Sequence, residues 1–213
     1  MKKLLYILSS MMFATLCFVS CGETEDENTI NGFEYVDLGL PSGTKWASSN
    51  VGAKKPESTG SYFAWGEVTE SNYTELECDA YNLSPADLSK NGITINSKLA
   101  PDYDAATHNM GTGWSTPTTT QFEELVAKCT WIWQENPKGY KVVGSNGNSI
   151  FLPVTGYITD EGSLSYPNEG YYWTSQVEAN SLQQALGFGI NSSDYKVRSF
   201  YRDRGRCVRA VTK

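Results

Sequence analysis

Sustained helical periodicity occurs only once in this chain, and that scarcity limits the folds open to it. After Pro117 the apolar side chains of one face recur at i, i+3, i+4 and i+7, namely Phe122, Leu125, Val126 and Cys129. This spacing predicts one amphipathic helix. Thr116 is expected to cap it, because threonine is a favoured N-cap and Pro117 fits the first helical turn. Asn136-Pro137 is expected to end it.

The rest of the chain after residue 31 consists mainly of short runs separated by turn residues. Two pairs of runs predict β-hairpins: residues 33–38 and 44–48 around Pro-Ser-Gly, and residues 140–143 and 148–152 around Asn146-Gly147. Further strands are predicted at 60–67, 155–158, 171–175, 185–190, 195–201 and 207–211, with short helical turns at 85–90 and 102–108. One or two helices among many short antiparallel strands indicate the α+β class, in one domain over residues 32–213.

The first 21 residues have the pattern of an export signal. Two lysines precede an apolar stretch, residues 4–19, which is too short to span a bilayer and matches the hydrophobic region of a secretory leader. Ser20-Cys21-Gly22 resembles the bacterial lipoprotein box, in which the cysteine is lipidated and becomes the new N-terminus. We therefore expect a signal peptide over 1–20 and lipidation of Cys21, with an ordinary cleaved signal as the alternative.

An acidic segment, residues 21–31, follows this leader. Residues 22–29 include four carboxylates and no apolar side chain, so they predict a flexible tether. Acidic residues directly after the cysteine also resemble the surface-export signal of Bacteroidetes lipoproteins. That resemblance implies an outer-membrane lipoprotein exposed at the cell surface, and a periplasm-facing lipoprotein is the alternative.

Charge and motif content exclude several functions. The 24 acidic residues against 17 basic ones give a net charge of −7, which repels phosphate backbones and argues against nucleic acid as a partner. The single histidine, His108, excludes sites that need two imidazoles. The chain has no nucleophile elbow, phosphate-binding loop or dinucleotide fingerprint.

A series of spaced motifs resembles a known group. The series is Tyr35-Val-Asp-Leu-Gly-Leu, Tyr62-Phe-Ala-Trp-Gly-Glu, Asp104-Ala-Ala, Gly113-Trp-Ser-Thr-Pro-Thr, Cys129-Thr-Trp-Ile-Trp, Asn146-Gly-Asn-Ser-Ile-Phe-Leu-Pro, Gly156-Tyr157, Tyr171-Tyr-Trp-Thr-Ser and Gly205-Arg-Cys-Val-Arg. In this order it resembles the Fibrobacter succinogenes major paralogous domain family, abundant among Bacteroidetes lipoproteins. The resemblance covers most of residues 33–211 and implies a single C-type lectin-like domain.

The chain departs from its apparent relatives at two places. Ser115 and Thr116 stand where relatives commonly carry arginine and an apolar residue, which weakens any role borrowed from that arginine. Formylglycine-generating enzymes share the implied fold but need two nearby C-terminal cysteines for copper. This chain has only Cys207 there, so an oxidase is excluded on ligand count.

Three cysteines remain in the domain. The lectin-like fold often ties an early helix to its last strand, so the resemblance implies a Cys129–Cys207 disulfide, and three buried thiols are the alternative. Cys78 is not expected to be a nucleophile, because its neighbours Glu77 and Asp79 are acidic.

All five arginines lie between Arg198 and Arg209. We expect them to pair with acidic loops of the protein and to clamp the C-terminal strands. The alternative is a small patch for an anionic glycan, with Arg202 and Arg204 as ligand candidates.

Aromatic residues supply the other ligand candidates. Most tryptophans are expected to fill the core, but Trp131 and Trp133 follow the helix closely and are not expected to face inward together. Tyr171 and Tyr172 could stack on sugar rings. Asn168 and Glu169 belong to a Pro-Asn-Glu sequence that faintly resembles the lectin sugar loop.

No cofactor is expected. Calcium is the one metal with plausible oxygen clusters, at residues 102–104, 167–169 and 191–194, and solvated turns are the default interpretation of all three.

These observations favour a surface-anchored lipoprotein whose domain recognises a glycan or an envelope or host protein without catalysis. Loops at residues 160–169 and 176–181 are the expected binding surface. One alternative is a polysaccharide-acting enzyme with Glu67 or Glu169 as acids. Another is a structural subunit of a surface assembly. Sequence patterns leave open the ligand, the membrane face and the oligomeric state.

Overall fold

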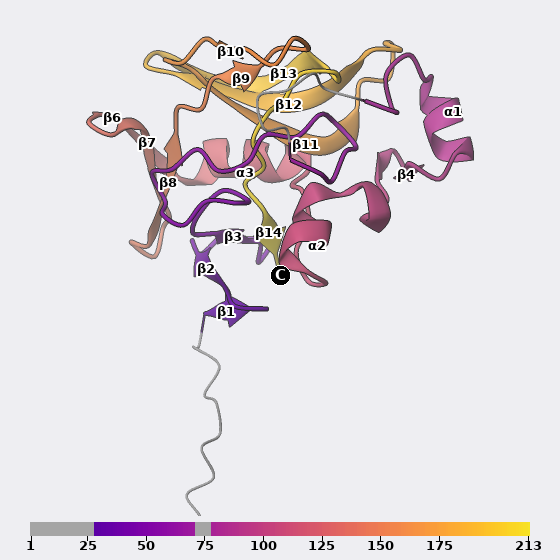
Figure 1. Cartoon of the computed structure of the whole chain (residues 1–213). Helices are drawn as coiled ribbons and strands as arrows, with labels where there is room; N and C mark the ends of the chain where they lie inside the picture. Colours follow the sequence, from indigo (N-terminus) through magenta and orange to yellow (C-terminus); the bar gives the residue numbers. More distant parts are fainter. Residues whose placement is uncertain (1–27, 71–77) are drawn as a thin grey trace, which may run out of the picture.

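The computed structural model describes residues 28–70 and 78–213. It consists mostly of antiparallel strands in several sheets, with three short α-helices among the described residues, so the predicted α+β class is confirmed (Figure 1). The predicted signal peptide, Cys21 and most of the predicted tether lie outside the described residues. None of the helices in 28–70 and 78–213 combines the length and apolar character needed to cross a membrane.

A four-stranded sheet joins the two ends of the described chain. Its order is β1 (Thr29–Ile30), β2 (Phe33–Asp37), β3 (Lys45–Ala47) and β14 (Val211–Thr212). The predicted first hairpin is confirmed, since Val36 pairs with Trp46. β1 pairs with β2, so the folded part begins before the predicted boundary at residue 32.

The middle of the chain contains short elements. They are α1 (Pro85–Lys90), β4 (Thr94–Ile95), β5 (Lys98–Leu99), the 3-10 helix η1 (Pro101–Tyr103) and α2 (Ala105–Met110). The helical turn at 85–90 is confirmed. The turn predicted at 102–108 divides into η1 and α2, because Asp104 caps α2 with its carboxylate.

The prediction of a strand at residues 60–67 is wrong. Only Phe63 forms a bridge, with Arg206, and the segment is otherwise irregular although its aromatic side chains are buried. Trp65 N donates to Arg202 O, and Trp65 Nε1 donates to Thr174 O. The aromatic side chains of this segment therefore fill the core from a loop, and its backbone does not pair as a β-strand.

The long helix is α3 (Thr119–Lys128), and both predicted ends differ. Thr118 is the N-cap, in a reciprocal capping box with Gln121, whereas Thr116 Oγ1 donates to Asp104. The helix ends well before Asn136, because residues Thr130–Glu135 form β6 and pair with the following strand. Phe122 and Leu125 of the predicted stripe are buried.

The remaining strands form three sheets. β6 (Thr130–Glu135), β7 (Lys138–Val143) and β8 (Ser149–Pro153) form a meander that contains the predicted Asn-Gly hairpin. β9 (Tyr157–Ile158) pairs with β10 (Leu164–Ser165). β11 (Gly170–Val177), β12 (Gln184–Asn191) and β13 (Asp194–Tyr201) form a larger sheet with β5 and β4. The run predicted at 207–211 is a strand only at its end, in β14.

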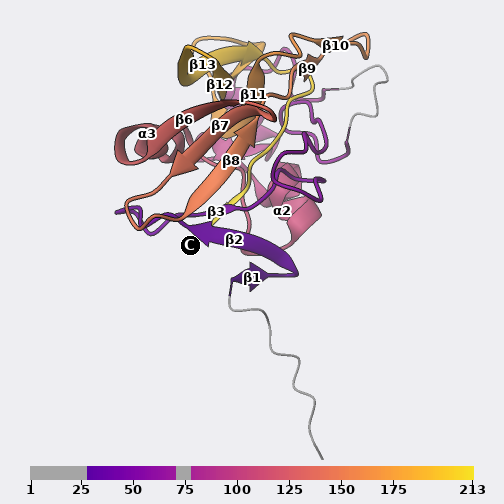
Figure 2. The same cartoon turned by 90° about the vertical axis from the view of Figure 1, so that its left-hand side faces the viewer.

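Two apolar cores hold these layers together. In the first, the Phe122 ring of α3 stacks on Phe188 of β12 at 4.4 Å and lies 5.0 Å from Trp46 of β3. The second contains Trp65, Trp114 and Trp173. Figure 2 shows the β6–β7–β8 meander facing the viewer with the β2–β3 hairpin below it, which is the arrangement that positions the site.

Candidate functional site

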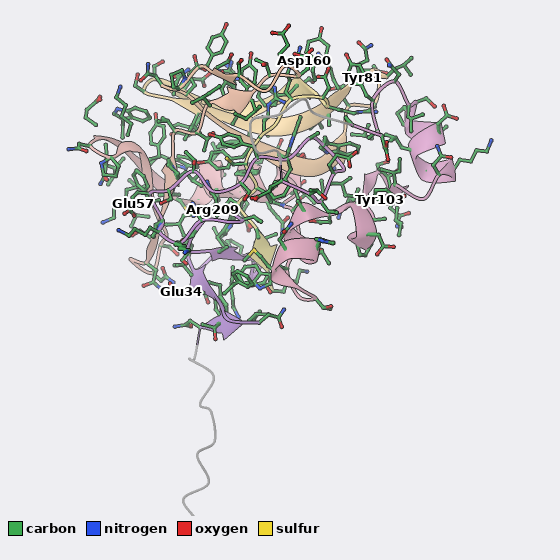
Figure 3. The ribbon with its side chains drawn as sticks, viewed as in Figure 1. Glu34, Glu57, Tyr81, Tyr103, Asp160 and Arg209 are labelled. Atoms are coloured by element: carbon green, nitrogen blue, oxygen red, sulfur yellow. The ribbon has the colours of Figure 1, made fainter. Side chains whose placement is uncertain are left out.

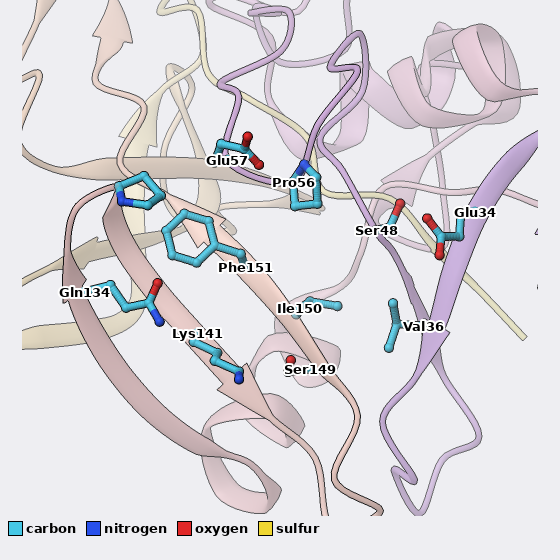
Figure 4. Close-up of a pocket in the computed structure, with 11 residues that line it drawn as sticks. Glu34, Val36, Ser48, Pro56, Glu57, Gln134, Lys141, Ser149, Ile150 and Phe151 are labelled. Atoms are coloured by element: carbon cyan, nitrogen blue, oxygen red, sulfur yellow. The ribbon is translucent and has the colours of Figure 1, made fainter.

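An open groove of about 400 Å³ lies between the β6–β7–β8 meander and the N-terminal sheet with its following loop (Figure 4). β2 and residues 48–57 supply Glu34, Ser48 and Glu57. The meander supplies Gln134, Lys141 and Phe151. A concave site of this size suits a small ligand or one segment of a larger one.

Strand alternation explains why these meander side chains face outward. Lys141 and Phe151 are paired across β7 and β8, and their sequence neighbours Tyr140, Val142 and Leu152 are buried in the first core. Successive side chains of a strand point to opposite faces, so the outward positions remain available to a ligand.

A glycine on the neighbouring strand makes room for Phe151, which lines the groove. A Cβ atom at Gly139 would lie 2.7 Å from Cζ of Phe151 and 2.4 Å from the carbonyl oxygen of Leu152. The Phe151 ring therefore occupies space that only glycine leaves free on the neighbouring strand. This support keeps a half-buried aromatic ring at the solvent-facing side of the sheet.

Arg209 ties the two sides of the groove together. Figure 3 shows it within the domain, near Glu57 and Glu34. Its guanidinium donates to the carbonyl oxygens of Phe151 at 2.8 Å and Ser48 at 3.1 Å, and to Asn50 Oδ1 at 2.8 Å. Asn50 in turn donates to Thr59 O at 2.8 Å, which holds the base of the loop that carries Glu57. Burial lowers the pKa of Arg209 to about 10, so the group stays charged at neutral pH.

The polar groups of the groove are mixed in sign and in hydrogen-bonding character. Glu57 and Glu34 belong to the same wall of the groove and stand apart along it in Figure 4, and Lys141 lies on the meander wall. Carboxylates accept, ammonium groups donate, and the Gln134 amide does both. A ligand rich in hydroxyl groups can satisfy all of them, while its apolar face contacts the Phe151 ring.

The two predicted tryptophan ligands do not lie in this groove. Trp131 stacks on Tyr195 at 4.4 Å and donates from Nε1 to Leu125 O at 3.1 Å. Trp133 lies edge-on to Tyr140 at 5.1 Å. The expectation that they could not both face inward is wrong, because they stand two apart on a strand and so share its inner face.

The predicted ligand candidates within residues 168–172 are divided between surface and core. Exposed Asn168 accepts from Lys138 Nζ at 2.8 Å, and Glu169 accepts from the Tyr171 hydroxyl at 2.8 Å. Tyr172 is completely buried and donates to Pro153 O, so its candidacy as a ligand is wrong. Its side chain alternates with the half-buried Tyr171 and points into the first core.

The arginines clamp the C-terminal segment, but largely through carbonyl groups. Arg202 is completely buried and is therefore not a ligand for an anionic glycan. It donates to the backbone carbonyls of Ala80, Leu83 and Gln184. Arg204 forms an ion pair with Asp160 at 2.5 Å. The expectation of acidic partners holds there and at Arg198, which pairs with Asp194 at 2.6 Å.

The expected Cys129–Cys207 disulfide is not formed, because both residues are free thiols in the structure. Both pack against the first core as small apolar side chains, Cys207 completely buried and Cys129 half-buried. Burial raises the pKa of Cys78 to about 12, and the nearby Glu67 carboxylate adds to the rise. The thiol of Cys78 is thus protonated at neutral pH, as expected for an unreactive group.

The oxygen clusters considered for calcium are engaged in local contacts. Asp104 is buried as the cap of α2, and burial raises its pKa above the usual range. Asp194 pairs with Lys196 and Arg198. Within the described part of the chain, no three cysteine, histidine or acidic side chains gather as a metal site would require.

The acids considered for catalysis lie outside the groove as well. Glu67 accepts from the backbone N–H of Asp79, and Glu169 from Tyr171. The groove residues themselves were missed by sequence reasoning. The hairpin pattern could have placed Phe151 outward, opposite the buried Ile150 and Leu152, but no pattern in residues 48–57 indicates the second wall.

Comparisons with family models, curated proteins and solved structures found no match to this chain. The geometry of the groove is therefore the basis for proposing a function.

Proposed function

We propose that this protein is a surface-anchored lipoprotein whose domain binds a glycan in the groove, without catalysis. The observation that carries the proposal is the Phe151 ring, held outward over Gly139 and surrounded by hydrogen-bonding side chains from two sides. An aromatic face with mixed donors and acceptors is the combination that recognises a sugar ring.

The proposal includes membership of the Fibrobacter succinogenes major paralogous domain family and its C-type lectin-like fold. Contacts between distant motifs support this part. Ser175 N donates to Pro117 O at 2.8 Å, and Trp173 N donates to Cys207 O at 2.9 Å. Motifs that bond to one another across the domain are those that would maintain a family fold.

The proposed anchor is a lipid on Cys21, followed by the acidic tether. In Figures 1 and 2 the chain enters the folded domain at β1, at the opposite end from β9 and β10. An anchor placed before β1 would leave the larger sheet facing away from the membrane. The groove, one wall of which is β2, would then lie on the side of the domain nearer the anchor, because β2 pairs with β1.

The test is titration calorimetry of the purified protein with soluble glycans, comparing wild type with Phe151→Ala. Loss of the aromatic contact should weaken binding by about tenfold, or roughly 1.4 kcal/mol. Tyr166→Ala is the matched control, because Tyr166 is 60 % exposed and lies in the loop first expected to bind. Weaker binding by the Tyr166 variant alone would move the site to that loop and overturn the groove proposal.

An enzyme acting on polysaccharide is the second candidate, because two carboxylates, Glu34 and Glu57, line the groove. Two carboxylates on either side of a sugar are the minimum that glycoside hydrolysis requires. Release of reducing sugar that Glu34→Gln and Glu57→Gln each abolish would establish this candidate. Binding without any release would favour recognition.

A further inference from the structure

A second pocket, of about 370 Å³, lies at the start of α3 and shares no lining residue with the groove in the described part of the chain. Most of its lining side chains carry hydroxyl, amide or charged groups, and Thr116, Thr118 and Gln121 belong to the segment that begins α3. Among the residues described, Leu99 is the apolar member of the lining, and no aromatic ring belongs to it. The pocket therefore offers hydrogen bonds and charges without a face for stacking a sugar ring, and its volume suits a small molecule.

The pocket is built where β11 meets the start of α3. Thr119 donates from its backbone N–H and from its hydroxyl to Gln176 Oε1, at 2.8 and 2.6 Å. Ser175 N donates to Pro117 O at 2.8 Å. The register of β11 against β12 shifts across residues 173–177, so Ser175 lies at an interruption of the ladder. Such interruptions redirect side chains out of the regular alternation of a strand, and Ser175 lines the pocket.

The Ser175 hydroxyl is buried without a hydrogen-bond partner. The residue is 3 % exposed, and its Oγ atom neither donates nor accepts within residues 28–70 and 78–213. Buried polar groups in native proteins nearly always have a partner, so an exception calls for a cause. Because Ser175 lines the pocket, an oxygen atom of a ligand bound there would accept the hydroxyl proton.

Asp104 contributes a buried carboxylate to the same lining. Its Oδ1 atom accepts from Ala106 N at 2.9 Å and from Thr116 Oγ1 at 2.7 Å. Thr116 N lies 3.0 Å from both carboxylate oxygens and is the described donor to Oδ2. A carboxylate oxygen accepts two hydrogen bonds when both donors are available, so Oδ2 has room for one donor from the pocket.

Two lysines supply positive charge at the pocket. Lys98 of β5 is paired with Gln176 of β11, and opposite residues of an antiparallel pair project to one face of the sheet. Gln176 bonds to the start of α3, so Lys98 projects toward the same region. Lys213 follows β14, where Val211 bridges to Ser115. Both lysines are exposed, so their ammonium groups lie on the solvent side of the buried hydroxyl and carboxylate.

We infer that this pocket binds a small carboxylic acid that has a hydroxyl or ammonium group beside its carboxyl group. The carboxylate of the ligand lies between Lys98 and the Ser175 hydroxyl, and both donate to it. The hydroxyl or ammonium group of the ligand donates to Asp104 Oδ2. The two ends of the ligand thus meet two kinds of group, cationic and hydroxyl donors at one end and a carboxylate acceptor at the other. The site is separate from the groove and does not depend on the proposed glycan.

Titration calorimetry of the purified full chain with lactate, alanine and propionate tests the inference, because these three acids differ in the group next to the carboxylate. Lactate or alanine should bind about tenfold more tightly than propionate. Lys98→Gln and Ser175→Ala should each weaken binding of the preferred acid by about tenfold. Lys90→Gln is the matched control, because Lys90 is exposed on α1 and does not line the pocket, and it should leave the affinity unchanged.

Ser175→Ala also separates ligand binding from a structural role. Since the hydroxyl has no partner to lose within the described residues, the urea midpoint of unfolding without added acid should stay unchanged. A lower midpoint would assign the hydroxyl to the fold and overturn its role in binding.

Three other results would overturn the inference. Equal affinity for propionate would remove the contact with Asp104. Affinity for the preferred acid that Ser175→Ala leaves unchanged would place the acid on the exposed lysines alone. No binding of any of the three acids would remove the site. Glycan titrations of the groove are unaffected by each of these results, so failure here is distinguishable from failure of the proposed function.

Discussion

At the scale of single residues, the buried arginines join segments that are distant in the sequence. Arg209 is completely buried, yet no acidic side chain among the described residues forms an ion pair with it. Its charge is compensated by the carbonyl oxygens of residues 47, 48 and 151 and by Asn50. A planar group with five donors suits several acceptors that come from different segments.

We predict that Arg209→Met lowers the free energy of unfolding by about 3 kcal/mol, because it leaves several buried carbonyl groups without a donor. Urea unfolding followed by tryptophan fluorescence measures the change. Arg198→Met is the matched control, since its side chain is 38 % exposed and its ion pair should contribute less than about 1 kcal/mol. Equal losses in the two variants would contradict the role given to Arg209.

At the scale of elements, α3 shows where sequence patterns succeed and where they fail. The apolar stripe identified the helix and two of its buried residues, Phe122 and Leu125. The helix starts two residues later than predicted, because Thr118 has Gln121 three residues after it and forms a capping box that Thr116 lacks. The helix ends earlier than predicted, at Lys128, because the residues after it form β6. The apolar residues Trp131 and Trp133 fit the inner face of a strand as well as they fit a helix, so the sequence pattern did not mark this end.

Thr118→Ala should lower the free energy of unfolding by about 1 kcal/mol. The backbone N–H of Gln121 loses its acceptor, the Thr118 hydroxyl, and the reciprocal bond from Thr118 N to the Gln121 side chain loses the other half of the capping box. Thr120→Ala changes the second residue of the same helix, at an exposed position, and should change stability by less than about 0.5 kcal/mol. Thermal unfolding of both variants compares them directly. A larger loss at Thr120 than at Thr118 would contradict the assigned cap.

At the scale of the whole molecule, the groove is assembled from segments distant in sequence. β14 pairs with β3 and so brings Arg209 beside Ser48. Arg209 also donates to Phe151 O, which joins the meander to the same place. The predicted boundaries of the domain changed for the same reason, since β1 extends this terminal sheet. Binding and stability are therefore expected to fail together when the terminal sheet is disrupted.

The proposed anchor also belongs to the whole molecule. Cells supplied with an alkyne-labelled fatty acid should incorporate the label into the wild-type protein and not into Cys21→Ser. In detergent phase partitioning, the wild-type protein should enter the detergent phase and the Cys21→Ser variant the aqueous phase. Cys17→Ser is the control and should keep the label, because only Cys21 stands in the Ser-Cys-Gly sequence that resembles a lipoprotein box. Label on the Cys21 variant would contradict the anchor.

Local chemistry in the sequence was sufficient for the α+β class, the two hairpins and the position of the main helix. These features depend on periodicity, turn residues and capping over a few neighbouring positions. The same patterns could not separate buried from exposed members of an arginine or aromatic cluster, as Arg202 and Tyr172 show. Whether such a side chain meets a carbonyl, a core or solvent depends on segments outside its own neighbourhood in the sequence, as the bond from Arg202 to Ala80 O shows. Only the tertiary structure brings those segments together.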